Sequence, residues 1–154
     1  MAMKVGSKAP EFTLFDTNKK PRQLSEFQGK KIVLAFYPGA FTGVCTKELC
    51  ALRDAMSNFN NLNAQVVGIS VDSPFANSAF AAQNNLQFPL LSDTTREVCK
   101  QYCGVYEDFA GIKGYNASKR AVFIVDANGI VTYVWISENP GVEPDYHAVS
   151  LALK

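Results

Sequence analysis

The stretch Lys31-Ile-Val-Leu-Ala-Phe-Tyr-Pro-Gly-Ala-Phe-Thr-Gly-Val-Cys45 decides the fold, because it joins a buried strand to the start of a helix. Residues 31–37 form a nearly continuous apolar run, as expected of a central strand that is covered on both faces. Pro38 and Gly39 end this strand. From about residue 42 to 60, apolar side chains recur at three- and four-residue steps, which predicts a helix. A strand that leads directly into a helix is typical of α/β architectures.

Further strands and helices follow in alternation. Ala64–Val71 reads as a second buried strand, and Ser73-Pro74 opens a helix to about Asn84 with Ser73 as its N-cap. Another helix is predicted from Thr94 to about Cys103, starting near Asp93 and stopped by Gly104. The two remaining strands, Ala121–Val125 and Ile130–Ile136, flank the turn sequence Asp126-Ala-Asn-Gly129 and predict a hairpin.

The two ends of the chain carry weaker signals. Glu11–Asp16 alternates apolar and polar residues like a half-buried edge strand, and Leu24–Phe27 reads as a short helical turn with Ser25 as a possible cap. The tail from Pro144 to Leu153 is weakly helical. Together the elements predict an α/β protein with a central mixed β-sheet flanked by helices, in the thioredoxin-like order with an N-terminal extension. The 154 residues are the length of a single domain, residues 1–154.

The composition excludes several classes of protein. Fifteen Lys and Arg against fourteen Asp and Glu give a formal charge of +1, without the basic surplus of a nucleic-acid or anionic-membrane binder. No apolar run approaches the roughly 18 residues of a membrane span, and the first ten residues lack the apolar core of a signal peptide. We therefore expect a cytoplasmic protein that binds neither nucleic acid nor membrane.

Cys45 lies where chemistry is expected. It falls in or just before the first turn of the helix that follows the buried strand, at the carboxyl edge of the sheet. Free amide groups and the positive end of the helix dipole favour a thiolate there, with a pKa below the usual value of about 8.5. Thr42 can turn its hydroxyl toward the sulfur or a bound oxygen, and Pro38 stiffens the loop and shields the thiolate. The alternative is a buried structural cysteine after a Pro-Gly turn.

The other cysteines are Cys50, Cys99 and Cys103. The spacings Cys-x4-Cys and Cys-x3-Cys differ from the Cys-x2-Cys of structural zinc sites, although four thiols in two pairs leave a zinc-binding module as an alternative. Cys99 and Cys103 lie on one face of a predicted helix, where we expect them to pack. The alternatives are that they pair with each other or that one of them reacts with Cys45 in place of Cys50.

The chain resembles the peroxiredoxins through Pro38-x3-Thr42-x2-Cys45, and the resemblance extends through Gly68–Asp72, Phe88–Asp93 and Arg120–Asp126. It implies a thioredoxin-like fold and a thiol-dependent peroxidase that acts on hydrogen peroxide and alkyl hydroperoxides. Cys45 would be the peroxidatic cysteine and Thr42 would bind the peroxide. Pro38 would shield the pocket, and Arg120 would hold the thiolate and the substrate oxygens. The sequence does not decide whether Arg120 or its neighbour Lys119 points inward. No metal or organic cofactor is implied.

Cys45-Thr-x-Glu48-x-Cys50 is similar to the bacterioferritin-comigratory (PrxQ-like) subgroup, in which the resolving cysteine lies five residues on. This implies a Cys45–Cys50 disulfide that an external dithiol such as thioredoxin reduces. The sequence differs from the subgroup at Gly43-Val44, and Cys50 as a core residue is the alternative. Five helical residues separate two Cα atoms by about 8.7 Å, whereas a disulfide needs less than about 7 Å. We therefore expect residues 42–52 to unfold locally during catalysis.

The residues leave the role of Glu48, two alternative functions and the oligomeric state open. Glu48 either orients nearby donors or complements the helix start, and His147 is expected to be exposed. A thiol–disulfide oxidoreductase on the same scaffold is an alternative function, although it usually employs Cys-x-x-Cys. A holdase assembled from oligomers is another, and the sequence is compatible with a monomer or a homo-oligomer.

Overall fold

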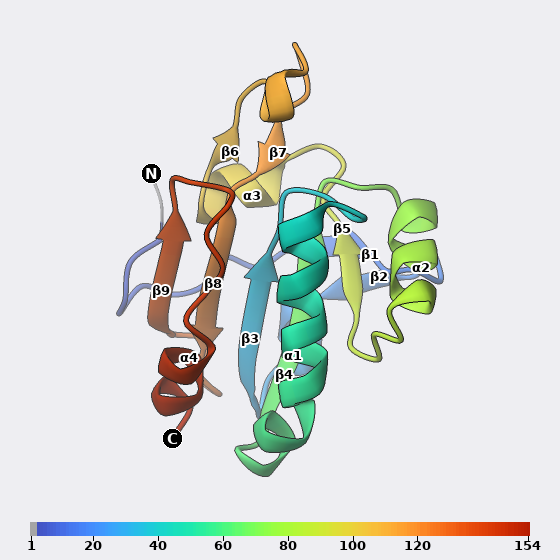
Figure 1. The fold of residues 1–154 in the computed structure, drawn as a ribbon. Coiled ribbons are helices and arrows are strands. Elements are labelled where there is room, and N and C mark those ends of the chain that lie inside the picture. Colours follow the sequence, from blue (N-terminus) through green and yellow to red (C-terminus); the bar gives the residue numbers. More distant parts are fainter. Residues whose placement is uncertain (1–2) are drawn as a thin grey trace.

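The computed structural model describes residues 3–154 and is built around a seven-stranded mixed sheet (Figure 1). The strands are β1 (Thr13–Phe15), β2 (Pro21–Gln23), β3 (Lys31–Phe36), β4 (Ala64–Ser70), β5 (Leu90–Ser92), β6 (Val105–Tyr106), β7 (Ala117–Ser118), β8 (Arg120–Val125) and β9 (Val131–Ser137). The helices are α1 (Gly43–Asn61), α2 (Pro74–Gln83), α3 (Glu97–Tyr102) and α4 (Tyr146–Ala152), with 3-10 turns at Leu24–Phe27 and Phe109–Gly111. The α/β class and the thioredoxin-like arrangement predicted from the sequence are confirmed.

The strand order in the sheet is β2-β1-β5-β4-β3-β8-β9. β3, β4 and β5 run parallel, while β8 lies antiparallel to β3 and β9 antiparallel to β8. β6 and β7 form a separate two-stranded ribbon between α3 and β8. β3 is an inner strand, between β4 and β8, so the loop that follows it leaves the sheet next to the ends of these two strands.

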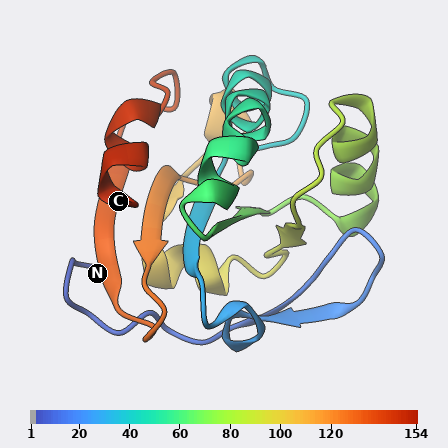
Figure 2. The same cartoon turned by 90° about the horizontal axis from the view of Figure 1, so that it is seen from below.

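The sheet divides the core in two. α1, α2 and α4 cover one face, and α3 covers the other together with the N-terminal segment (Figure 2). β3 contributes to both halves of the core. Val33 and Ala35, with Tyr37 directly after the strand, pack toward α1, and Ile32, Leu34 and Phe36 pack toward α3. This explains the continuous apolar run, because a strand buried on both faces has no polar position.

Most predicted elements are present with shifts of a few residues at their ends. Ser73 caps α2, since its hydroxyl accepts the amide of Ala76 at 3.1 Å. In the β8–β9 turn, Asp126 Oδ1 accepts the amides of Asn128 and Ile130, and Gly129 has a positive φ of 83°. The hairpin predicted from Asp126-Ala-Asn-Gly129 is confirmed.

Three local predictions were wrong. β1 is not an edge strand, because it pairs with β5 on one side and with the unpredicted β2 on the other. The cap of the turn at 24–27 is Gln23 rather than Ser25. α3 begins at Glu97 rather than at Thr94, yet Asp93 still serves its start, because its carboxylate accepts the amides of Val98 and Cys99.

Candidate active site

Cys45 is the third residue of α1, directly after the loop that leaves β3. Thr42 is the N-cap residue, with extended backbone angles, so Cys45 lies in the first turn where amide groups have no helical partner. The side chain faces the sheet and is fully buried (0 % exposed). The prediction that Cys45 occupies the N-terminal turn of this helix is confirmed. Because the thiol is buried against the sheet, the side chains on that face of the sheet determine its environment.

Arg120 supplies that environment from the first position of β8. Side chains alternate along a strand, and Val122 and Ile124 face α1, so Arg120 faces the same way. It is 1 % exposed. Lys119 lies one residue earlier and instead forms a surface ion pair with Glu138 at 2.8 Å. The structure thus settles which of the two cations points inward.

The guanidinium of Arg120 is held by three groups. Its Nη1 donates to Cys45 Sγ at 3.2 Å and to Glu48 Oε1 at 2.7 Å. Its Nε and Nη2 both donate to the carbonyl of Pro140, at 3.0 and 2.8 Å. Such a planar fork cannot be reproduced by a lysine, and it fixes the cation directly against the sulfur.

A tyrosine from the β6–β7 ribbon holds the backbone of Arg120. The hydroxyl of Tyr106 accepts the amide of Arg120 at 3.2 Å and donates to the carbonyl of Ser137 at 2.6 Å. Arg120 and Ser137 are register partners in the β8–β9 ladder. Tyr106 therefore ties the ends of both strands together at the residue that carries the guanidinium.

The loop before Cys45 is held on two sides. Thr42 Oγ1 donates to the carbonyl of Gly39 at 2.7 Å, and the amide of Ala40 donates to Asp72 at 2.8 Å. Phe41 adopts a left-handed backbone with φ of 67°, which is uncommon for a bulky side chain, and its ring packs edge-on against Phe80.

Pro38 is buried where this loop begins, immediately after Tyr37. The structure therefore brings Pro38, Thr42, Cys45 and Arg120 together at one sheet edge.

The pKa of Cys45 differs from the sequence expectation. Burial raises the pKa of this thiol above its ordinary value, although Arg120, Thr42 and the Gly39 loop act to lower it. The charge of Glu48 raises it further. The helix start and the arginine are present as predicted, but the effect of burial on the pKa of Cys45 is larger than their combined effect.

Glu48 is the residue whose importance the sequence left undecided. It lies one turn after Cys45 and is fully buried in an ion pair with Arg120. Its Oε2 has no hydrogen-bond partner within residues 3–154. Burial raises the pKa of Glu48 to about 7 against the opposing effect of Arg120. The i,i+3 spacing from Cys45 was the available sequence signal.

Cys50 lies on the same helix but points elsewhere. Its thiol is partly buried and contacts the side-chain oxygen of Asn84, the C-cap residue of α2, at 3.6 Å. Cys45 faces Arg120 and the sheet, and both thiols are free. The structure places both cysteines on an intact α1 with their side chains directed at different elements.

Cys99 and Cys103 lie in the opposite half of the core, with the sheet between them and Cys45. Cys99 Sγ donates to Asp93 at 2.7 Å, and burial raises the pKa of both thiols well above the ordinary value. Packing, the expected role of the two residues, fits this placement. The four thiols cannot meet around one metal ion, and no cluster of three potential ligands occurs within residues 3–154.

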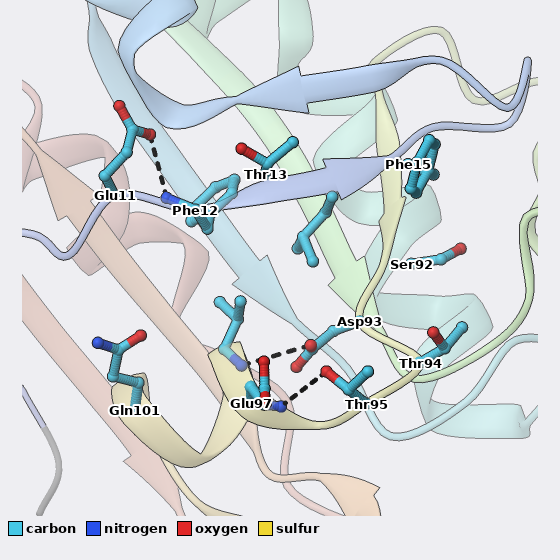
Figure 3. Close-up of a pocket in the computed structure, with 12 residues that line it drawn as sticks. Glu11, Phe12, Thr13, Phe15, Ser92, Asp93, Thr94, Thr95, Glu97 and Gln101 are labelled. Atoms are coloured by element: carbon cyan, nitrogen blue, oxygen red, sulfur yellow. Dashed lines mark hydrogen bonds between the residues drawn. The ribbon is translucent and has the colours of Figure 1, made fainter.

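A surface pocket of about 360 Å³ lies between β1 and α3, away from Cys45 (Figure 3). Its most buried acidic group, Asp93, already accepts hydrogen bonds from the amides of Val98 and Cys99 in α3. Figure 3 also shows Glu97 and Gln101 at its α3 side. None of the residues proposed for the Cys45 site lines it. His147 is exposed, as expected.

A cysteine at a helix start, held by an arginine on a thioredoxin-like sheet, defines the class of thiol-dependent enzymes on this fold. The AhpC/TSA family model matches residues 5–134, and the chain belongs to this family of peroxiredoxins. It is an enzyme of the peroxiredoxin type.

The similar proteins cover nearly the whole chain. A putative peroxiredoxin bcp of Coxiella burnetii is 38% identical over 98% of this chain and 97% of its own length. Peroxiredoxin Q of Sedum lineare, a chloroplastic protein, is 41% identical over 92% of this chain and 72% of its own. The crystal structure of peroxidoxin BcpB from Mycobacterium tuberculosis superposes with a TM-score of 0.86 at 34% identity, covering 98% and 96% of the two chains. In the described part of this chain, no helix has the length and apolar character needed to cross a bilayer.

Proposed function

We propose that this peroxiredoxin reduces hydrogen peroxide and alkyl hydroperoxides through a sulfenic acid on Cys45. The observation that carries the proposal is the 3.2 Å contact between Arg120 Nη1 and Cys45 Sγ in the first turn of α1. Attack on a peroxide needs an ionised sulfur and donors that stabilise charge on the departing oxygen. The sulfur takes one oxygen and becomes Cys–SOH, the O–O bond breaks, and the other oxygen leaves as water or an alcohol.

The donor count of Arg120 supports its role toward substrate. A guanidinium has five N–H groups. Four have acceptors within residues 3–154: two on Nη1 go to Cys45 and Glu48, and one each on Nε and Nη2 go to Pro140. The second N–H of Nη2 is left to bind a peroxide oxygen beside the sulfur. In this proposal Thr42 turns its hydroxyl from the carbonyl of Gly39 toward the peroxide, and Pro38 shields the thiolate from bulk water.

Cys50 is proposed as the resolving residue. Its thiol attacks the sulfur of the Cys45 sulfenic acid, a disulfide forms and water leaves. The alternatives, Cys99 and Cys103, lie across the sheet. Since both reacting cysteines belong to one helix and face different elements, the first turns of α1 unwind before the bond closes.

The disulfide is then reduced by an external dithiol protein of the thioredoxin type. Because thiols stay reduced in the cytoplasm, we propose this compartment as the site of action. A reducing compartment also keeps Cys99 and Cys103 as thiols, in agreement with their packed positions.

The test is peroxide consumption with a dithiol reductant. Cys45→Ser abolishes turnover, whereas Cys103→Ser, a matched change across the sheet, retains it. Disulfide mapping by mass spectrometry after one equivalent of peroxide gives a Cys45–Cys50 link in the wild type. Cys50→Ser gives a sulfenic acid and no internal link. Full activity of Cys45→Ser would refute the proposal.

A further inference from the structure

Two acids in the site share one cation. The thiol of Cys45 and the carboxyl of Glu48 both contact the same nitrogen, Nη1 of Arg120, at 3.2 and 2.7 Å. Sγ and Oε1 are therefore less than about 6 Å apart, and both side chains are fully buried. With both acids ionised, this buried cluster would carry a net negative charge, which low dielectric surroundings disfavour.

The neighbouring groups do not provide a second cation. Glu48 faces Arg120 of β8 and Cys45 of its own helix, and the charge of Glu143, in the segment before α4, also acts on it. Tyr37 and Tyr146 lie near enough to feel the charge of Glu48, and burial raises the pKa of both phenols, so they are neutral near pH 7. Glu143 only strengthens the preference for an uncharged Glu48.

The carboxyl group itself has a place for a proton. Oε1 accepts the bond from Arg120, while Oε2 is buried without a partner in the described part of the chain. A buried, charged carboxylate oxygen without a hydrogen bond destabilises the folded protein. A proton on this oxygen makes the carboxyl group neutral and removes that penalty. A proton on Oε2 leaves the contact of Oε1 with Arg120 intact.

We propose that Glu48 is a positioning residue that holds the proton lost by Cys45, so that the reactive state pairs the Cys45 thiolate with Arg120 beside an uncharged Glu48. The exchange is Cys45–SH + Glu48–COO⁻ → Cys45–S⁻ + Glu48–COOH. Because burial raises the pKa of Cys45 above its ordinary value while the pKa of Glu48 is about 7, the right-hand pair is the less populated, reactive form. Attack on a hydroperoxide then gives neutral Cys45–SOH, the proton from Glu48 balances the departing alkoxide as an alcohol, and Glu48 becomes a carboxylate again. The inference rests on the proposed function, because it assigns the charge state of the same site.

The experiment is the pH dependence of Cys45 alkylation by iodoacetamide, followed on the Cys45 peptide by mass spectrometry. Glu48→Gln keeps an oxygen acceptor for Arg120 but carries no charge. Its profile is expected to be a single titration displaced to lower pH by roughly one to two units, the size of one unit charge at this distance.

Glu138→Gln is the matched control, since Glu138 forms the neighbouring ion pair with Lys119 at the surface. Its profile should stay within a few tenths of a unit of the wild type. An unchanged Glu48→Gln profile, or one displaced to higher pH, would overturn the assignment of Glu48 while leaving the peroxidase proposal in place. Loss of the peroxidase proposal would instead appear as activity in Cys45→Ser.

A second measurement does not depend on the folding of Glu48→Gln. Carbon-13 NMR of the glutamate carboxyls should show one buried group titrating near neutral pH in the reduced wild type. Because coupling between two sites is reciprocal, Cys45→Ser should lower that titration. Titration at the same pH in both proteins would also overturn the inference.

Discussion

At the scale of single residues, the site depends on the shape of the Arg120 side chain. One planar group contacts Cys45, Glu48 and the carbonyl of Pro140 at once. A lysine carries the same charge but only a single nitrogen at its end, so it cannot make these contacts together. Arg120 therefore contributes the geometry of its donors as well as its positive charge.

We expect Arg120→Lys to lower the second-order rate constant for oxidation of Cys45 by about 10²- to 10³-fold, the usual cost of a misplaced donor at a reacting centre. The rate can be followed by stopped-flow fluorescence, because Trp135 is the single tryptophan and packs against the α1 side of the core. Lys119→Arg is the matched control and should change the rate less than two-fold. Equal rates for Arg120→Lys and the wild type would contradict this role.

Sequence reasoning reached the residues of the site unevenly. Cys45 and Thr42 could be placed, because a strand, a Pro-Gly turn and a helix start are local features. The inward position of Arg120 depended on which face of β8 lies under α1, and this is a tertiary fact. The raised pKa of Cys45 could not be anticipated for the same reason, since it follows from burial and from the charge of Glu48.

At the scale of elements, α1 carries Cys45 and Cys50 and presents them to different neighbours. Cys45 faces β8, while Cys50 contacts Asn84 at the end of α2. Arg53 also reaches α2, donating to the carbonyl of Asn84 at 2.7 Å. In the proposed mechanism, formation of a Cys45–Cys50 disulfide therefore requires the first turns of α1 to unwind while its later turns stay packed, which makes the stability of the first turn a control point.

Gly43 allows this control point to be tested. It is exposed at the first position of α1, and a Cβ added there meets no atom within 4 Å. Alanine favours the helix over glycine by up to about 1 kcal/mol. We expect Gly43→Ala to slow Cys45–Cys50 disulfide formation two- to five-fold and to increase sulfinic acid on Cys45 at high peroxide. Quenched-flow mass spectrometry measures both products.

Ser57→Ala is the control for that experiment, because Ser57 is exposed in the later half of α1 and the change raises helix propensity there as well. It should leave the ratio of disulfide to sulfinic acid unchanged. If Gly43→Ala formed the disulfide as fast as the wild type, unwinding of the first turn would not limit resolution.

Elements were predictable from the sequence where the periodicity was long. α1, α2, β3, β4 and the β8–β9 hairpin have such patterns or strong turn signals. Four strands have only two or three residues each, namely β2, β5, β6 and β7. Such short segments show no alternation of apolar and polar residues in the sequence, and they form because they hydrogen-bond to neighbouring strands. The start of α3 was placed too early because Thr94 and Thr95 form a turn, with Arg96 left-handed at φ of 67°.

At the scale of the whole molecule, the sheet separates two pairs of cysteines with different surroundings. Cys45 and Cys50 lie on the α1 side or at its edge, and Cys99 and Cys103 lie in the half covered by α3. The same separation leaves the buried Arg120–Glu48 pair isolated in the α1 half of the core. A buried acid with a raised pKa makes the stability of the whole protein depend on pH.

The sign of this dependence follows from the pKa of Glu48. Burial raises it from 4.5 to about 7, so between these values the folded protein binds more protons than the unfolded chain. Stability from this group is fully present below about pH 4.5, declines as pH rises, and is lost above about pH 7. The effect is opposite to that of an acid whose pKa is lowered by a salt bridge.

We expect Glu48→Gln to match the wild type in stability near pH 4 and to exceed it by up to about 3 kcal/mol at pH 8, since glutamine has no charge to desolvate. Urea unfolding of the reduced proteins at a series of pH values measures the difference. Glu138→Gln, which removes an exposed carboxylate, should show no such trend. If the advantage of Glu48→Gln shrank as pH rose, the carboxylate would be stabilised by Arg120 more than burial opposes it, and Glu48 would be charged throughout the neutral range.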